Sequence, residues 1–220
     1  MGNADKERDF WETKAAAGVY VAIEAIGPDP SMWDGAQLES DLQRILRAID
    51  LNKNDSTRIL DLGCGIGRVA IPLAQRLAVR SDRPWDVIGV DISDSMLRYA
   101  AARDRALPNP SVYDWVLCDG RTLPRYGPLA LTYSLLTLQH IPRDAAADYI
   151  RQIGEQTPLG GALLFQTLEG TGGDFLWNEM TEDFATEICG AAGFEVVEFE
   201  RVKSNTADNV TAIWVTGVRT

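Results

Sequence analysis

Two segments of the chain combine residue types that are typical of a site for a nucleoside. The apolar run Arg58 to Leu62 leads directly into Gly63-Cys64-Gly65-Ile66-Gly67. Glycines at alternate positions allow a tight turn and a close approach of the backbone to a ligand. A second apolar run ends at Asp91, where a carboxylate can accept hydrogen bonds from both hydroxyls of a ribose. The two segments predict a site for an adenosine-containing ligand.

The spacing of the glycines argues against the two commonest phosphate-bearing cofactor classes. The dinucleotide fingerprint places its third glycine three positions after the second, where this chain has Arg68. A phosphate-cradling loop would end in lysine followed by Ser or Thr, and none closes this loop. The pattern therefore favours an adenosine ligand without a pyrophosphate.

His140, the one histidine of the chain, lies in the segment Leu136 to Pro142, just beyond the strand expected at Leu129 to Ser134. An imidazole with an unperturbed pKa of about 6.5 suits proton transfer from an attacking hydroxyl or amine. The same segment is also consistent with a structural turn whose histidine bonds to the backbone. The sequence leaves both interpretations open.

The order of apolar and amphipathic segments places these residues on a mostly parallel sheet of seven strands, wound by helices on both faces. The last two strands have only the polar link 204–208 between them, which predicts an antiparallel hairpin. The expected strands are Arg58 to Leu62, Asp86 to Asp91, Val112 to Cys118, Leu129 to Ser134, Gly161 to Thr167, Phe194 to Lys203 and Asn209 to Arg219. The expected helices are Ala36 to Leu51, Arg68 to Val79, Ser95 to Ala106, Ala145 to Gln156 and Glu182 to Ala192, with another within Asp5 to Ile26.

Composition limits the partners of the chain. Its 220 residues suit one compact domain, which we divide into an N-terminal helical segment, residues 1–57, and a cofactor-binding domain, residues 58–220. A formal net charge of -11 argues against nucleic-acid and membrane partners. Three cysteines without close pairing argue against a zinc site or a disulfide framework, and no run is apolar enough to cross a bilayer. We expect a cytoplasmic monomer or homodimer without a bound metal.

The motifs ILDLGCGIG at 59–67, VIGVDIS at 87–93 and LCDG at 117–120 resemble those of the class I S-adenosylmethionine-dependent methyltransferases, a Rossmann-like family. The similarity extends in element order from Arg58 to Thr220, including the final hairpin. It implies S-adenosyl-L-methionine as the cofactor. The residues that it assigns to the cofactor are Asp61, Gly63, Cys64, Gly65 and Gly67 near the methionine part, Asp91 at the ribose, and Ile92, Met96, Asp119 and Gly120 at the adenine. Ser134 is also assigned to cofactor binding.

Each of these residues also has a plainer interpretation. The glycine loop can be only a turn, Asp91 a helix cap, Met96 a core residue and Asp119 a turn residue. The assignment is favoured because the acids and glycines follow successive strands at one edge, where open α/β sheets bind ligands.

The methyl acceptor is not identified by the sequence. In the family that the chain resembles, the N-terminal segment and the loops after the fourth and fifth strands build the acceptor pocket, and aromatic residues in these parts could stack on a planar acceptor. We assign Trp11, Tyr20, Tyr133 and Trp177 to acceptor binding, with packing of the N-terminal helix as the alternative for Trp11 and Tyr20. The favoured acceptor is an O or N nucleophile of a small molecule. A protein or peptide amine, and a non-catalytic protein that binds the cofactor, remain as alternatives.

Overall fold

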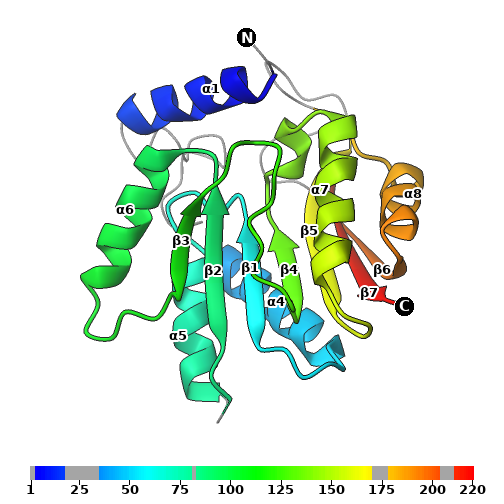
Figure 1. Ribbon diagram of the computed structural model, residues 1–220, viewed down its shortest axis with the longest axis horizontal. Helices are drawn as coiled ribbons and strands as arrows, with labels where there is room; N and C mark the ends of the chain where they lie inside the picture. Colours follow the sequence, from blue (N-terminus) through cyan, green and yellow to red (C-terminus); the bar gives the residue numbers. More distant parts are fainter. Residues whose placement is uncertain (1–2, 18–34, 81–82, 170–177, 204–210) are drawn as a thin grey trace.

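The apolar runs form one seven-stranded sheet in the order β3-β2-β1-β4-β5-β7-β6 (Figure 1). The computed structural model describes residues 3–17, 35–80, 83–169, 178–203 and 211–220. The strands are β1 (Arg58–Leu62), β2 (Asp86–Asp91), β3 (Asp114–Leu117), β4 (Leu131–Ser134), β5 (Ala162–Glu169), β6 (Phe194–Lys203) and β7 (Thr211–Arg219). The helices are α1 (Asn3–Ala17), α4 (Ala36–Leu51), α5 (Ala70–Arg80), α6 (Asp94–Arg105), α7 (Arg143–Gln156), α8 (Glu182–Ala191) and the short 3₁₀ helix η1 (Leu138–His140).

The predicted strand directions are confirmed. Strands β1 to β5 pair in parallel, and β7 pairs antiparallel with both β5 and β6. Parallel pairing aligns the carboxyl ends of β1, β2 and β4 at one edge of the sheet, which brings the segments that follow these strands together. The predicted link 204–208 lies outside the described residues, as do residues 18–26 of the expected first helix.

The third strand is shorter at its start than predicted, and the amide of its first expected residue, Val112, donates to a side chain. The sequence pattern predicts a strand from Val112, whereas β3 begins at Asp114. The backbone amides of Ser111 and Val112 donate to the carboxylate of Asp104, at 3.1 and 3.4 Å. This buried aspartate thus holds the segment that leads into β3. The fourth strand likewise begins at Leu131 and not at Leu129.

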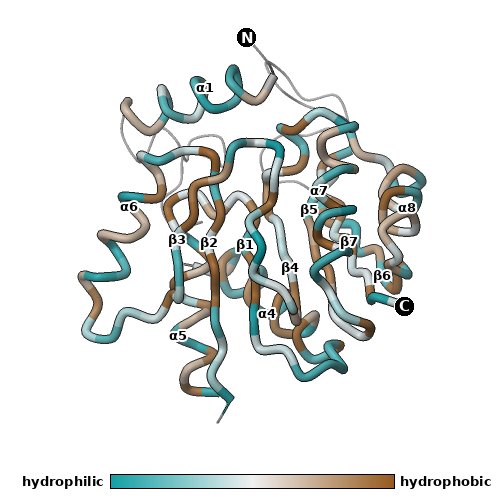
Figure 2. Tube along the Cα trace, viewed as in Figure 1, coloured by the Kyte–Doolittle hydropathy of each residue, from teal (hydrophilic) through white to brown (hydrophobic). Residues whose placement is uncertain are grey.

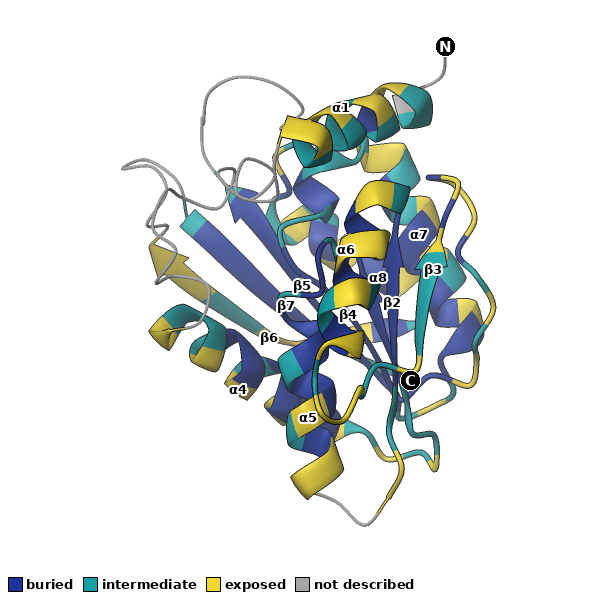
Figure 3. Ribbon diagram, turned by 90° about the vertical axis from the view of Figure 1, so that its left-hand side faces the viewer, coloured by how far each residue is buried: buried dark blue, intermediate teal, exposed yellow. Residues whose placement is uncertain are grey.

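The core lies in two layers, one on each face of the sheet. Helices α4 and α5 cover one face, where Leu42, Ile45 and Leu73 pack on the strands, and α7 and α8 cover the other, where Ile150 and Ile188 are buried. Figure 2 shows hydrophobic residues along the strands and the inward helix faces. Figure 3 shows β2, β5 and β7 as mostly buried, whereas the edge strands β3 and β6 are more exposed. The two layers fix the strands and therefore the positions of the loops at their carboxyl ends.

Helix α1 lies across the carboxyl edge of the sheet, close to the segments that follow β2 and β3 (Figures 1 and 3). The carboxylate of Glu12 accepts hydrogen bonds from the amide and hydroxyl of Ser95, at 3.2 and 2.5 Å. The guanidinium of Arg8 donates to the carbonyl of Asp119 at 3.1 Å. These contacts hold α1 over the edge where the glycine loop and Asp91 meet.

Candidate active site

The three glycines of the loop after β1 serve different purposes. Gly63, Gly65 and Gly67 all have positive φ, at 79, 52 and 72°. A Cβ on Gly63 would lie 2.1 Å from Oγ1 of Thr137, and one on Gly67 would lie 2.6 Å from the ring of Trp115, so packing within the protein excludes both. Among the described residues, a Cβ on Gly65 would meet only the sulfur of Met96, at 3.8 Å. These residues leave open the space in front of Gly65, which suits a ligand that approaches the backbone.

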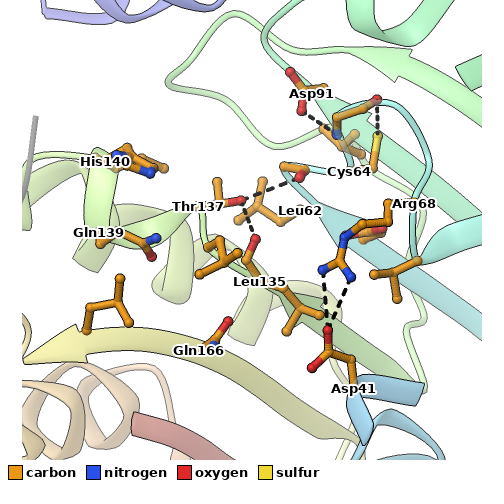
Figure 4. Close-up of a pocket in the computed structure, with 18 of the residues that line it drawn as sticks. Asp41, Leu62, Cys64, Arg68, Asp91, Leu135, Thr137, Gln139, His140 and Gln166 are labelled. Carbon is orange, nitrogen blue, oxygen red and sulfur yellow. Dashed lines mark hydrogen bonds and ion pairs between the residues drawn. The ribbon is translucent and has the colours of Figure 1, made fainter. Parts of the chain in front are cut away.

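Asp91, the last residue of β2, is buried beside this loop. Its Oδ2 accepts from the amide of Gly65 at 2.7 Å (Figure 4). Its Oδ1 accepts from the amide of Ser93 at 2.9 Å. Burial raises the pKa of this carboxyl group, and the backbone hydrogen bonds oppose that shift. An ionised carboxylate has about four acceptor positions, so Asp91 retains capacity to accept from two ligand hydroxyls.

Asp61 lies in β1 with a buried carboxylate that accepts a 2.9 Å hydrogen bond from the hydroxyl of Tyr133. Burial, with repulsion from Asp91, raises the pKa of Asp61 to about 7. Tyr133 itself is fully buried, packs in the core under α4 and α5, and does not line the cavity. The expectation that Tyr133 contacts an acceptor is therefore corrected, because the alternation along β4 directs this side chain into the core, where it supports Asp61.

A cavity of about 340 Å³ opens at the carboxyl edge of the sheet, within the size range of small-molecule sites. Side chains from opposite directions converge on it (Figure 4). Of the predicted cofactor residues, Asp61, Gly63, Cys64, Gly65, Asp91, Ile92, Met96 and Gly120 line it. One wall thus combines the glycine loop with the carboxyl ends of β1 and β2, as the sequence pattern predicts.

Three predicted cofactor residues lie outside this lining. Gly67 faces Trp115, and the hydroxyl of Ser134 donates to the carbonyl of Leu62 at 2.9 Å. Asp119 uses Oδ1 to accept from the amides of Arg121 and Thr122, at 2.8 and 2.6 Å, which lowers its pKa. Gly67 and Ser134 shape the loop, and Asp119 holds the turn after β3.

The cavity also has polar lining residues that the sequence motifs do not reveal. Glu7 in α1 is buried, its Oε1 has no hydrogen-bond partner within the described part of the chain, and burial raises the pKa of its carboxyl group. Asp41 in α4 pairs with Arg68 at 3.3 Å, and Gln139 in η1 is buried in the lining. Nothing in the spacing of these residues along the chain signals their meeting, since α4 and η1 are brought together only by the fold.

His140 and Trp11 meet at the mouth of this cavity. Their rings lie edge to face, with centroids 5.3 Å apart and an interplanar angle of 75°. Both residues line the cavity, so the structure places Trp11 at the site from α1 and His140 from η1. The other two predicted acceptor residues, Tyr20 and Trp177, lie outside the described residues.

Part of the chain matches a family of known proteins. Residues 59–161 match the family model of a methyltransferase domain. This central part of the chain is therefore similar to a methyltransferase domain. The matched span contains the glycine loop, Asp91 and His140. No curated protein sequence matches the chain.

Solved structures with low sequence identity to this chain share its fold. Magnesium protoporphyrin IX methyltransferase from Synechocystis PCC 6803 has a TM-score of 0.72 at 16% identity, with 100% of this chain and 98% of that chain covered. Geranyl diphosphate C-methyltransferase from Streptomyces coelicolor A3(2) has a TM-score of 0.73 at 9% identity, with the same coverage. Phospholethanolamine N-methyltransferase 2 from Haemonchus contortus has a TM-score of 0.73 at 18% identity and covers 100% of this chain and 60% of that chain. Their names span very different acceptors, so the likeness establishes the fold and leaves the acceptor open.

The cysteines of the chain are buried, and its described residues form neither a metal site nor a membrane-spanning helix. Cys64, Cys118 and Cys189 are buried free thiols, and burial raises the pKa of each. The described part of the chain holds no group of three or more His, Cys, Asp or Glu that could bind a metal ion. Among its described helices, none is both long and apolar enough to cross a membrane.

The raised pKa of Asp61 predicts a pH dependence of stability that Asp61→Asn removes. The folded value of about 7 exceeds the ordinary value of 3.8, so the folded state holds a proton that the unfolded state has lost between these pH values. Stability from this group is complete below about pH 4 and is lost as the pH rises through 7. Relative to wild type, Asp61→Asn should gain roughly 2–3 kcal/mol between pH 5 and pH 8. Thermal melts of both proteins across this interval measure it, and a constant difference in Tm would contradict the prediction.

Proposed function

We propose that this protein transfers a methyl group from S-adenosylmethionine to an oxygen or nitrogen nucleophile of a small molecule. One observation carries the proposal: the open space at Gly65 and the buried carboxylate of Asp91 line the same cavity as His140. A ligand bound at the first two residues therefore shares an enclosed space with a potential proton acceptor.

The residues of this cavity fit the cofactor of the methyltransferase class. Asp91 would accept hydrogen bonds from the ribose hydroxyls, and the backbone at Gly63 and Gly65 would lie against the methionine part. Ile92 and Met96 offer apolar contacts to the adenine, and α1 covers this part of the cavity from above. The cofactor supplies an activated methyl group when bound. We propose residues 58–220 as the domain that binds it and residues 1–57 as the segment that caps it.

The remaining task of the protein is to hold a nucleophile in line with the methyl group and to exclude water. The ring of Trp11 and the apolar side chains of Leu135, Leu136 and Ile141 provide a water-poor surface for an acceptor. His140 would take the proton that the nucleophile loses. A small acceptor suits the size of the enclosed space better than a folded protein does.

Methyl transfer is tested directly with cofactor labelled in its methyl group. The protein is incubated with the labelled cofactor and a panel of small phenols, alcohols, amines and carboxylates, and products are separated by mass. We expect label in at least one O- or N-methylated product, together with S-adenosylhomocysteine. Transfer only to added peptides would favour the peptide methyltransferase alternative, and binding without transfer to any acceptor would favour a non-catalytic protein.

His140→Ala should lower the methylation rate by about 10²-fold while cofactor affinity stays near normal, because the nucleophile loses its proton acceptor. His140→Phe is the matched variant, since it keeps a ring against Trp11 but has no basic nitrogen. Rates and melting temperatures are measured on the same preparations. Full rate in the phenylalanine variant would assign His140 to packing and remove it from proton transfer.

A further inference from the structure

Two glutamine side chains project into the end of the cavity that lies away from Asp91. Gln139 comes from η1 and Gln166 from β5, and their carboxamides point into the same space from opposite sides (Figure 4). Gln139 is only 2% exposed and Gln166 only 9% exposed. The Oε1 atom of Gln139 is buried and has no hydrogen-bond partner among the residues that the structure describes.

A buried carboxamide oxygen without a partner destabilises a folded protein, and native structures rarely retain one without a reason. The backbone carbonyl of Gln139 accepts from the amide of Asn178 at 2.7 Å, so the segment is fixed although the side-chain oxygen is unsatisfied. A ligand group that donates to this oxygen would remove the cost. A hydroxyl or an amide is such a donor, and both can also accept from the NH₂ group of a carboxamide.

Asp41 and Arg44, the two charged side chains that α4 contributes to this lining, are already paired with other charged residues. Asp41 pairs with Arg68 at 3.3 Å and accepts from Gln37 at 2.8 Å. Arg44 makes a two-pronged ion pair with Glu200, at 2.5 and 2.8 Å, and stacks on the ring of Trp214. A charged ligand at this end would therefore compete with existing pairs.

The rest of this end is apolar, apart from the exposed Lys203 at the end of β6. Leu136, Leu168 and Ala212 pack together as a small separate cluster that lines the cavity, and the ring of Trp214 lies beside it. Such a surface favours a ligand with a sizeable apolar part.

We infer that Gln139 and Gln166 form the recognition site for an uncharged, largely apolar acceptor that carries a hydroxyl or amide group. The inference rests on the proposed methyl transfer and deepens it, because it names the class of acceptor. It excludes acceptors that carry phosphate or carboxylate groups as substrates of this protein. The two glutamines recognise the acceptor and take no part in binding the cofactor.

The test uses a panel of matched pairs: uncharged phenols and hydroxylated aromatic amides, and the same scaffolds bearing a phosphate or carboxylate. Binding of each compound is measured by saturation-transfer NMR with S-adenosylhomocysteine present, on wild type, Gln139→Leu and Gln166→Leu. Gln43→Leu is the control, since Gln43 is an exposed residue of α4 outside the cavity lining. Calorimetry gives the Kd of S-adenosylhomocysteine, and thermal melts give the Tm of each ligand-free protein.

We expect the wild-type protein to bind each uncharged compound more tightly than its charged partner. Both cavity variants should bind the uncharged compounds about tenfold more weakly than the wild-type protein does. The Kd of S-adenosylhomocysteine should stay unchanged, and the Tm of Gln139→Leu should equal or exceed that of wild type by about 2–4 °C, because a buried unsatisfied oxygen is removed. The inference would be overturned if the wild-type protein preferred the charged compounds or bound none of the compounds. It would also be overturned if binding were unchanged in both variants, or if the Tm of Gln139→Leu were lowered. Failure of wild type to bind S-adenosylhomocysteine would instead count against the proposed function.

Discussion

Asp91→Ala should weaken binding of S-adenosylmethionine by about 10²-fold or more while the protein remains folded. In the proposed binding mode, the variant removes a charged acceptor from two ribose hydroxyls, and a hydrogen bond to a charged group contributes about 1.5–3 kcal/mol. The structure adds a second effect, because the amides of Gly65 and Ser93 also lose their shared acceptor. We therefore expect a lower Tm together with the loss of affinity.

Asp104→Ala separates these two effects. Asp104 is also a buried aspartate whose carboxylate accepts from two backbone amides, but it lies near the far end of α6 and outside the cavity lining. Its substitution should lower the Tm to a similar extent and leave the cofactor affinity unchanged. Calorimetric titration of both variants decides the matter. Equal affinities in wild type and Asp91→Ala would remove Asp91 from the cofactor site.

Gly65→Asn should abolish cofactor binding at little cost in stability. Asparagine tolerates the left-handed conformation that φ of 52° requires, and a Cβ at this position meets only Met96 among the described residues. The added side chain would instead occupy the space that the ligand needs. We expect affinity to fall by about 10²-fold or more, since contact with the backbone is lost along with the space.

Two other glycine variants calibrate this result. Gly160→Asn has the same chemistry at a positive φ of 80° but lies away from the cavity, so it should bind the cofactor normally. Gly63→Ala would force a Cβ against Thr137 and should lower the Tm. Circular dichroism and titration on each protein distinguish these effects. Normal affinity in a folded Gly65→Asn would mean that the loop is only a turn.

The meeting of the glycine loop and Asp91 in one wall of the cavity could be predicted from the sequence because its parts are local. A strand, a glycine turn and an acid at the next strand end are each contiguous in the chain, and parallel pairing brings such ends to one edge. The presence of seven strands, the mostly parallel pairing and the antiparallel final hairpin followed from the same alternation of apolar and amphipathic segments and from the short link between the last two strands. The start of β3 was predicted too early, and the sequence does not reveal the bonds of Asp104 to residues seven and eight positions later.

The end of the cavity that contains Gln139 and Gln166 is formed by packing between distant segments. The sequence therefore did not predict it. Residue type alone suggested Tyr133 as an acceptor contact, yet its place in β4 turns it into the core. Gln139 stands next to His140, but its burial becomes evident only when η1 is seated over β5. The pairing of Asp41 with Arg68 likewise joins α4 to the segment before α5, and no motif links them.

Titration of the wild-type protein with S-adenosylhomocysteine in a calorimeter tests the central claim most directly. Because this compound shares the nucleoside and amino-acid parts of the cofactor and cannot transfer a methyl group, the heat reports binding alone. We predict saturable binding at one site per chain, with a Kd in the micromolar range typical of enzyme ligands. Absence of saturable binding in a protein that is folded by circular dichroism would contradict the account.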